Sequence, residues 1–227
     1  HGGLRYLENF EFDLVYESLR ERFIQWKSVP HLVKPLRFII PVYRGDRRPF
    51  WMMKLGVFLY DLLSGKYVVE KHKSLTVKEV VSAIAGIKRE GLLGGVAYSD
   101  CRMDDARLCL ENILSAREHG AHIANYVQVV SFLKVSTQLT AGANVKDVLT
   151  GEAMTIKAHH VVCAAGPWTN ELLRLDMPAS QDKIRLTKGV HIIYKEKISD
   201  TALLLQAGKD NRIFFVIPFE DHSMIGT

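Results

Sequence analysis

The apolar residues of this chain recur with two different periods, and the change of period limits the folds that the chain can adopt. Up to Gly120 they are spaced mostly three and four residues apart, which is the spacing of one helix face. After Ala121 short apolar runs alternate with turn residues, which is typical of strands. This order of helices, a strand meander and a final group of antiparallel strands predicts a mixture of the α/β and α+β classes.

Four segments before Gly120 are predicted to be helical. The clearest covers residues 10–27 and ends before Pro30, because proline disfavours helix in the preceding residue. The other three cover residues 50–63, 76–88 and 104–119. Asp104 and Asp105 look like paired catalytic carboxylates, but the preferred interpretation is a cap at the start of the last helix.

Strands are expected once in the first half of the chain and throughout the rest. Residues 36–42 form an apolar run between prolines. The other expected strands cover residues 123–133, 135–139, 144–149, 153–158, 160–165, 188–194, 203–206, 212–218 and 223–226. The strand at 160–165 is expected to be buried, and the last four strands are expected to form a separate antiparallel sheet. Gly91, Gly94 and Gly95 predict a loop.

The charge balance allows an anionic partner but does not favour nucleic acid. The net charge is +5 and the sequence pI is about 9.1, which suits a phosphorylated substrate or an anionic lipid surface. Basic residues are scattered, and neither zinc-finger spacing nor an RNA-binding aromatic motif accompanies them, so we expect no nucleic-acid partner and no metal. The three cysteines, without a CxxC pair, predict reduced thiols.

Residues 50–63 form the most apolar stretch of the chain. The stretch is too short to span a bilayer, which needs about 20 apolar residues, and Lys54 and Asp61 interrupt it. A buried helix is the favoured interpretation. A helix on a membrane surface is the alternative, because the segment has a basic flank formed by Arg44, Arg47, Arg48 and Lys66.

Two regions carry residue types that suit chemistry on a flat, anionic ligand. At the start of the chain, glycines let a backbone approach a ligand closely, and Arg5 offers a planar fork for phosphate. His1 adds a residue type that can take a proton near neutral pH. Three other interpretations are equally open there: His1 is a remnant of a tag, the glycines form a simple turn, and Arg5 is a surface residue. In the second region, Ala165 and Gly166 follow an apolar run, and Trp168 is read as core packing before a stacking platform.

Seven segments, in order along the chain, are similar in sequence to motifs of one enzyme family. They are HGGLRYLE (1–8), PHLVKPLRF (30–38), RPFW (48–51), YSDC (98–101), DDARL (104–108), AAGPW (164–168) and RLTKGVH (185–191). Together they resemble FAD-dependent glycerol-3-phosphate dehydrogenase. In that family a βαβ unit precedes the first segment and further substrate residues follow the last strand, so we expect an internal fragment that is inactive alone.

The resemblance implies a flavoprotein fold of the FAD/NAD(P)-binding, D-amino-acid-oxidase-like type, truncated here, with an antiparallel-sheet substrate domain. It implies that residues 1–37 and 100–175 belong to a discontinuous FAD-binding domain, and residues 38–99 and 176–227 to a substrate or cap domain. The implied cofactor is FAD. The oligomeric state is not implied.

The implied activity is oxidation of sn-glycerol 3-phosphate to dihydroxyacetone phosphate by hydride transfer to FAD. Electrons would pass to a membrane quinone, and the enzyme would lie on the cytoplasmic face of the inner membrane as a peripheral protein. The alternatives are an oxidase that uses oxygen and a non-enzymatic remnant without flavin.

The resemblance also assigns roles to individual residues. His1 is the expected base, Arg5 the anion clamp and Tyr6 a wall of the pocket, and Lys188 and His191 are expected near the substrate. The residues expected to contact the cofactor are Gly2, Gly3, Leu4, Val129, Ala165, Gly166 and Trp168.

Overall fold

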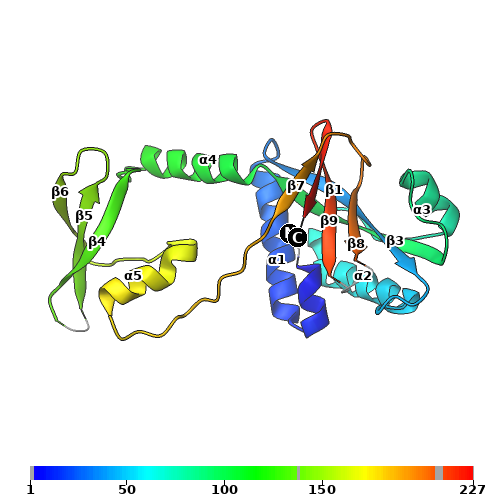
Figure 1. Ribbon diagram of the computed structural model, residues 1–227, viewed down its shortest axis with the longest axis horizontal. Coiled ribbons are helices and arrows are strands. Elements are labelled where there is room, and N and C mark those ends of the chain that lie inside the picture. Colours follow the sequence, from blue (N-terminus) through cyan, green and yellow to red (C-terminus); the bar gives the residue numbers. More distant parts are fainter. Residues whose placement is uncertain (1–2, 137–138, 208–211, 227) are drawn as a thin grey trace. The chain divides into compact units, whose positions relative to one another are not determined.

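The computed structural model describes residues 3–136, 139–207 and 212–226, which fold as two units. The first unit comprises His1–Asn112 and Gly189–Thr227, and the second comprises Ile113–Lys188. Figure 1 shows the elements of both units. The mixed and antiparallel sheets with helices confirm the predicted fold class. The domain bounds implied by the resemblance remain a prediction.

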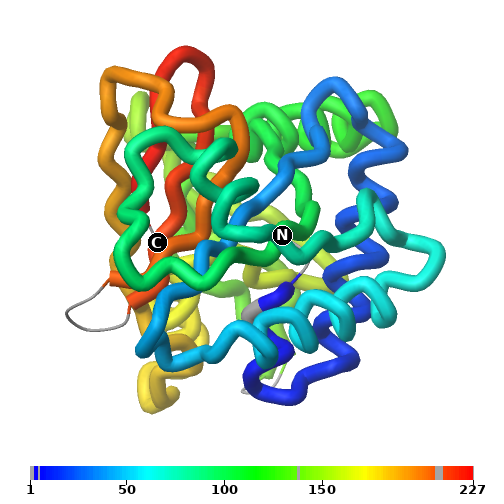
Figure 2. Tube along the Cα trace, turned by 90° about the vertical axis from the view of Figure 1, so that its right-hand side faces the viewer, coloured from blue at the N-terminus to red at the C-terminus, as the bar shows by residue number. Residues whose placement is uncertain are grey.

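A seven-stranded mixed sheet is the framework of the first unit. Its strand order is β2-β3-β1-β8-β9-β10-β7. The strands are β1 (Val33–Tyr43), β2 (Lys73–Leu75), β3 (Leu92–Met103), β7 (His191–Tyr194), β8 (Ala202–Gln206), β9 (Ile213–Phe219) and β10 (His222–Gly226). The last four strands are antiparallel to one another as expected, but they do not form a separate sheet. Strand β8 pairs in parallel with β1, at Phe38 and Ala202, and so joins them to the first strands (Figure 2).

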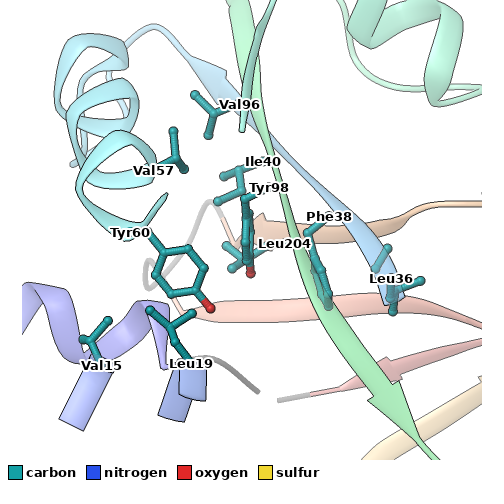
Figure 3. Close-up of a cluster of buried hydrophobic side chains, with 11 residues drawn as sticks. Val15, Leu19, Leu36, Phe38, Ile40, Val57, Tyr60, Val96, Tyr98 and Leu204 are labelled. Carbon is teal, nitrogen blue, oxygen red and sulfur yellow. The ribbon is translucent and has the colours of Figure 1, made fainter. Parts of the chain in front are cut away.

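Helices cover both faces of this sheet. The helices are η1 (Leu4–Asn9), α1 (Phe12–Ser28), α2 (Phe50–Ser64), η2 (Gly65–Tyr67) and α3 (Val77–Ala83). Neighbouring residues of β1 point to opposite faces. Phe38 packs in a cluster with Leu19 of α1 and Val57 of α2 (Figure 3). Ile39 packs instead with Val80 of α3. The predicted helices at 10–27 and 50–63 are confirmed. The third is shorter than predicted, and Gly86, with φ of 74°, lies beyond its end.

Strand β3 was not predicted, because two of its glycines were interpreted as loop residues. The prediction is wrong for Gly94 and Gly95. A Cβ atom on Gly94, whose φ is 136°, would lie 2.5 Å from the Leu75 carbonyl oxygen, and one on Gly95 would lie 2.9 Å from the Ile40 carbonyl oxygen. Glycine at these positions therefore permits the close approach of neighbouring strands.

The second unit contains a three-stranded antiparallel sheet, the short helix η3, helix α5 and the C-terminal part of α4. Its elements are β4 (Val127–Lys134), β5 (Thr140–Asp147), β6 (Ala153–Lys157), η3 (Gly166–Trp168) and α5 (Thr169–Asp176), and α4 (Asp105–Glu118) runs into it from the first unit's residues. The predicted helix at 104–119 and most of the meander are confirmed. The expected strand at 135–139 includes two positions outside the described residues, and its described residues are not in a strand.

The expected buried strand at 160–165 does not form. The segment has no regular secondary structure, and Val162 is 85% exposed. Each backbone N–H and C=O group of a strand needs a hydrogen-bond partner, and within the described parts of this unit no strand pairs with this segment. The apolar run therefore lacks the neighbours that would bury it.

Candidate functional site

The segment expected to meet the substrate forms the short helix η1, which is bounded by two left-handed residues. Gly3 has φ of 76°, and its carbonyl oxygen accepts a hydrogen bond from the Tyr6 N–H at 2.9 Å. A Cβ atom at Gly3 would lie 2.7 Å from the Tyr6 ring. At the other end Phe10 has φ of 59°. The ring of Tyr6 therefore occupies the space that glycine leaves open at position 3.

An ion pair fixes η1 to the loop that precedes α2. The Arg48 guanidinium donates to both carboxylate oxygens of Glu8, and the contact from Nη2 to Oε2 is 2.7 Å. Leu4 and Leu7, on the inner side of η1, pack against the cluster that contains α1 and α2. This bidentate geometry holds the segment in one orientation better than a single contact would.

An apolar cavity of about 410 Å³ lies between η1, α2 and the sheet. Six of its apolar lining residues are Leu4, Leu7, Val42, Met53, Val57 and Leu204. Arg47 and Arg48 also line it, together with Glu8 and Asp46. The cavity therefore combines an apolar body with charged groups, which is the usual composition of a site for an organic ligand.

Helix α2 buries one face and exposes another. Val57, Tyr60 and Ser64 are buried. The exposed apolar stripe consists of Trp51, Leu55, Phe58 and Leu62, and we call it the α2 outer face. The favoured prediction of a buried helix is therefore correct for one face only. Within the described residues, none of the helices combines the length and apolar character needed to cross a membrane.

A buried charged network, which sequence reasoning missed, ties the elements of the first unit together. Arg22 of α1 is 3% exposed. Its Nη1 donates to the Ser99 carbonyl at 3.1 Å and the Tyr60 hydroxyl at 3.3 Å, and lies 3.5 Å from an Asp100 carboxylate oxygen. Its Nη2 donates to the Tyr67 carbonyl at 3.2 Å. Burial, the largest cause, and the nearby Asp100 carboxylate raise the pKa of Tyr60 well above its ordinary value.

The signal that could have revealed this network is the position of Arg22 in the helix. It follows Leu19 by three residues and precedes Trp26 by four, so it lies on the apolar stripe of α1. An arginine on such a stripe must have buried partners, because an unpaired buried charge is costly.

In the second unit, the residues expected to contact the cofactor lie where the backbone is accessible. Gly166 has φ of 52°, and no heavy atom lies within 4 Å of where a Cβ would be. The Trp168 N–H donates to the Ala165 carbonyl at 3.1 Å, and the Trp168 side chain is exposed, so the preferred core reading of Trp168 is wrong for the described residues. Val129 lies in β4, opposite Val145 of β5.

His191 lies on the edge strand of the seven-stranded sheet. It pairs with Gly226 of β10, and a Cβ on that glycine would lie 2.3 Å from the imidazole ring. The glycine thus allows the ring to rest on the neighbouring strand. Lys188 is exposed at the end of the second unit. His1 and Gly2 lie outside the described residues.

The described members of the expected site are divided between the two units. Gly3, Leu4, Tyr6 and His191 belong to the first unit. The other described members, Val129, Ala165, Gly166, Trp168 and Lys188, belong to the second. Leu4 lines the apolar cavity. The assigned roles remain predictions.

The chain matches one family model over its whole length. Residues 1–227 match the model described as FAD dependent oxidoreductase. The chain therefore belongs to the FAD dependent oxidoreductase family.

Within this class the chain is similar to glycerol-3-phosphate dehydrogenases, which confirms the resemblance. It is 38% identical to the aerobic glycerol-3-phosphate dehydrogenase of Staphylococcus aureus strain MRSA252, over 100% of this chain and 41% of that protein. The glycerol-3-phosphate dehydrogenase of Bacillus halodurans, complexed with FAD, superposes with a TM-score of 0.68 at 27% identity, over 91% of this chain and 36% of that one. The L-alpha-glycerophosphate oxidase of Mycoplasma pneumoniae, with FAD bound, shares the fold, with a TM-score of 0.63 at 15% identity over 93% of this chain and 54% of that one.

The chain spans about two fifths of the length of the curated relatives it matches. The family's cofactor is FAD, and two expected contacts can be tested against it. Gly166 fits a flat ring, because its backbone is open to approach. The Tyr6 ring occupies the space beside Gly3, which accounts for glycine at this position. The conformation of Gly3 alone therefore does not indicate contact with a cofactor.

Proposed function

We propose that the protein containing this chain oxidises sn-glycerol 3-phosphate to dihydroxyacetone phosphate with FAD. The observation that carries the proposal is the 38% identity, over the full chain, to an aerobic glycerol-3-phosphate dehydrogenase. FAD supplies the hydride acceptor, a role for which enzymes use a cofactor. The oxidase that uses oxygen is the second candidate, and it is less favoured because the matching oxidase is only 15% identical.

The residues of this chain bind and orient the substrate in this proposal. Arg5 binds the anionic phosphate, since a guanidinium matches phosphate geometry. Tyr6 forms one wall, and its ring is held beside Gly3. His1 accepts the proton of the C2 hydroxyl as that carbon loses its hydride, and His191 lies near the substrate with Lys188.

The contacts to FAD come mainly from the second unit. Ala165 and Gly166 offer an open backbone, and Trp168 offers an exposed ring beside it. Val129 contributes from β4. Gly2, Gly3 and Leu4 of the first unit complete the proposed set.

Replacing Arg5 with alanine in the full-length protein is expected to lower kcat/KM for glycerol 3-phosphate about ten- to a hundredfold. A charge-assisted hydrogen bond to an anion is worth about 1.5–3 kcal/mol. Flavin content should change less than KM, because the clamp acts on the substrate. Arg20→Ala is the matched control, since Arg20 is exposed and pairs only loosely with Glu21 at 3.9 Å. Unchanged kinetics in Arg5→Ala would refute the clamp.

We also propose that a quinone accepts the electrons and that the protein is held peripherally on the cytoplasmic face of the inner membrane. The support is the α2 outer face, where Trp51 is 67% and Leu62 65% exposed. Lys54, Lys66 and Arg47 flank this face and would meet anionic lipid headgroups.

Replacing Trp51 and Phe58 together with serine is expected to weaken binding of the full-length protein to anionic liposomes by about tenfold or more. Burying one large apolar side chain contributes about 1.5–3 kcal/mol. Flotation at low and high salt measures this binding, and Arg47→Glu should weaken it at low salt only, because salt screens the headgroup charge. Leu14→Ser, on an exposed position of α1, is the control. If the double variant floats like the unchanged protein, the α2 outer face is not the contact.

A further inference from the structure

We infer that the ion pair between Glu8 and Arg48 is a positioning pair for substrate binding, an inference that rests on the proposed function. The pair holds η1, and with it Arg5, in the orientation that binds the anionic phosphate of the substrate. Both residues act through the backbone of η1 and do not themselves contact the substrate. The support comes from the structure of η1, the geometry of the ion pair and the surroundings of Arg48.

Helix η1 depends on contacts from outside itself. It is a 3-10 helix of six residues, Leu4–Asn9, and such helices longer than about three or four residues are uncommon because their hydrogen-bond geometry is poor. Among the described residues, no side chain caps its first turn. It also has neither an acidic residue in its first turn nor a basic one in its last turn to complement the helix dipole. Its orientation is therefore set by the elements around it.

Two kinds of contact hold η1, and only one of them is directional. Leu4 and Leu7 pack against the cluster that contains α1 and α2, but apolar packing has no preferred direction. The Arg48 guanidinium donates to both carboxylate oxygens of Glu8, and this planar fork fixes the position of the carboxylate. Glu8 follows Arg5 by three residues, which is about one turn of a 3-10 helix. A displacement of Glu8 therefore also moves the backbone that carries Arg5.

Arg48 is the fixed member of the pair. The loop before it is closed by two contacts, in which the Tyr43 N–H donates to the Asp46 carboxylate at 2.7 Å and the Asp46 N–H donates to the Tyr43 carbonyl at 3.2 Å. Arg48 directly precedes Pro49, the N-cap residue of α2. Its side chain is 19% exposed, whereas that of Glu8 is 51% exposed. The strand β1 and helix α2 therefore hold Arg48, and η1 is oriented by it.

Replacing Arg48 with glutamine in the full-length protein is expected to raise the KM for sn-glycerol 3-phosphate about three- to tenfold, because a displaced Arg5 keeps only part of its charge-assisted bond. The kcat should change by less than about twofold, which is typical of a loss of binding alone. Flavin content should not change, since exposed ion pairs contribute little to stability. Steady-state kinetics with a soluble dye as electron acceptor measure both constants. Arg44→Gln is the matched control, because it removes the same charge from an exposed residue of the same loop.

Two double variants test whether the effect belongs to the pair and passes through Arg5. Glu8→Gln should raise KM as Arg48→Gln does, and the two together should be no worse than either alone, because they remove one interaction. In an Arg5→Ala background, Arg48→Gln should raise KM by less than about twofold further, because no clamp remains to be positioned.

Hydrogen exchange of the full-length protein, without substrate, measures how firmly η1 is held. We expect the amide hydrogens of residues 4–11 to exchange about threefold or more faster in Arg48→Gln than in Arg44→Gln, because local opening of the helix becomes easier. Equal exchange or equal KM values in these two variants would overturn the inference. An undiminished effect of Arg48→Gln in the Arg5→Ala background would overturn it as well. Failure of the proposed function appears separately, as an unchanged protein whose bound FAD is not reduced by glycerol 3-phosphate.

Discussion

Replacing Arg22 with methionine is expected to lower the free energy of unfolding by about 3–5 kcal/mol. The variant leaves the Asp100 carboxylate buried without its arginine, and it removes the donor of the Ser99 and Tyr67 carbonyls. The hydrogen bonds that join α1 to α2, η2 and β3 through the Arg22 side chain are then lost. Urea denaturation of the full-length protein, followed by tryptophan fluorescence, measures the change.

Two further variants separate the charge effect from a general packing effect. Adding Asp100→Asn to Arg22→Met should restore more than about 1 kcal/mol, because it removes the buried carboxylate charge that has lost its arginine. Arg20→Ala, two residues earlier in α1 at an exposed ion pair, should cost less than about 1 kcal/mol. A loss in Arg22→Met no larger than that in Arg20→Ala would show that the buried network does not stabilise the unit.

Replacing Gly142 with alanine is expected to destabilise the three-stranded sheet by roughly 3 kcal/mol or more. Gly142 lies in β5 with φ of 146°, and a Cβ there would lie 2.0 Å from the Ile156 carbonyl oxygen of β6. Backbone atoms cannot move aside as a side-chain tip can, so β5 and β6 must separate. Hydrogen exchange over residues 140–157 measures the loss.

Gly151→Ala is the matched control for this prediction. Gly151 also has a positive φ, 83°, but no heavy atom lies within 4 Å of its Cβ position. It should suffer only the backbone strain of a left-handed residue, about 1–2 kcal/mol. If the amide hydrogens of both variants exchange at the same rate, backbone strain alone destabilises Gly142→Ala. The strands β5 and β6 would then not be in close contact at this position.

The elements predicted correctly are those whose pattern of residue types is local. The predictions were wrong where residues far apart in the sequence determine the structure. Helix α1 was found because its apolar residues recur at helical steps, and α2 because residues 50–63 form the most apolar stretch of the chain. Strand β3 was missed because Gly94 and Gly95 resemble loop residues, although they are needed where Leu75 and Ile40 approach. The apolar run at 160–165 has the composition of a buried strand, but a strand also needs partners, which composition cannot reveal.

The candidate site was predictable in a different way. The roles of Arg5, Tyr6 and Gly166 came from a resemblance carried by ordered motifs, and their family is confirmed by the match over residues 1–227. The apolar cavity was not predictable, since Leu4, Val57 and the other lining residues come from elements far apart in the sequence. The local pattern of α2 indicated its apolar character but not which face would be buried.

Anaerobic addition of sn-glycerol 3-phosphate to the full-length protein tests the central claim most directly. The oxidised flavin absorbs in the visible range, and transfer of a hydride from the substrate bleaches that band. We expect complete bleaching in the unchanged protein and a requirement for about ten- to a hundredfold more substrate in Arg5→Ala, because the anion clamp is lost. A protein that retains FAD but whose absorption does not change with glycerol 3-phosphate would contradict the account.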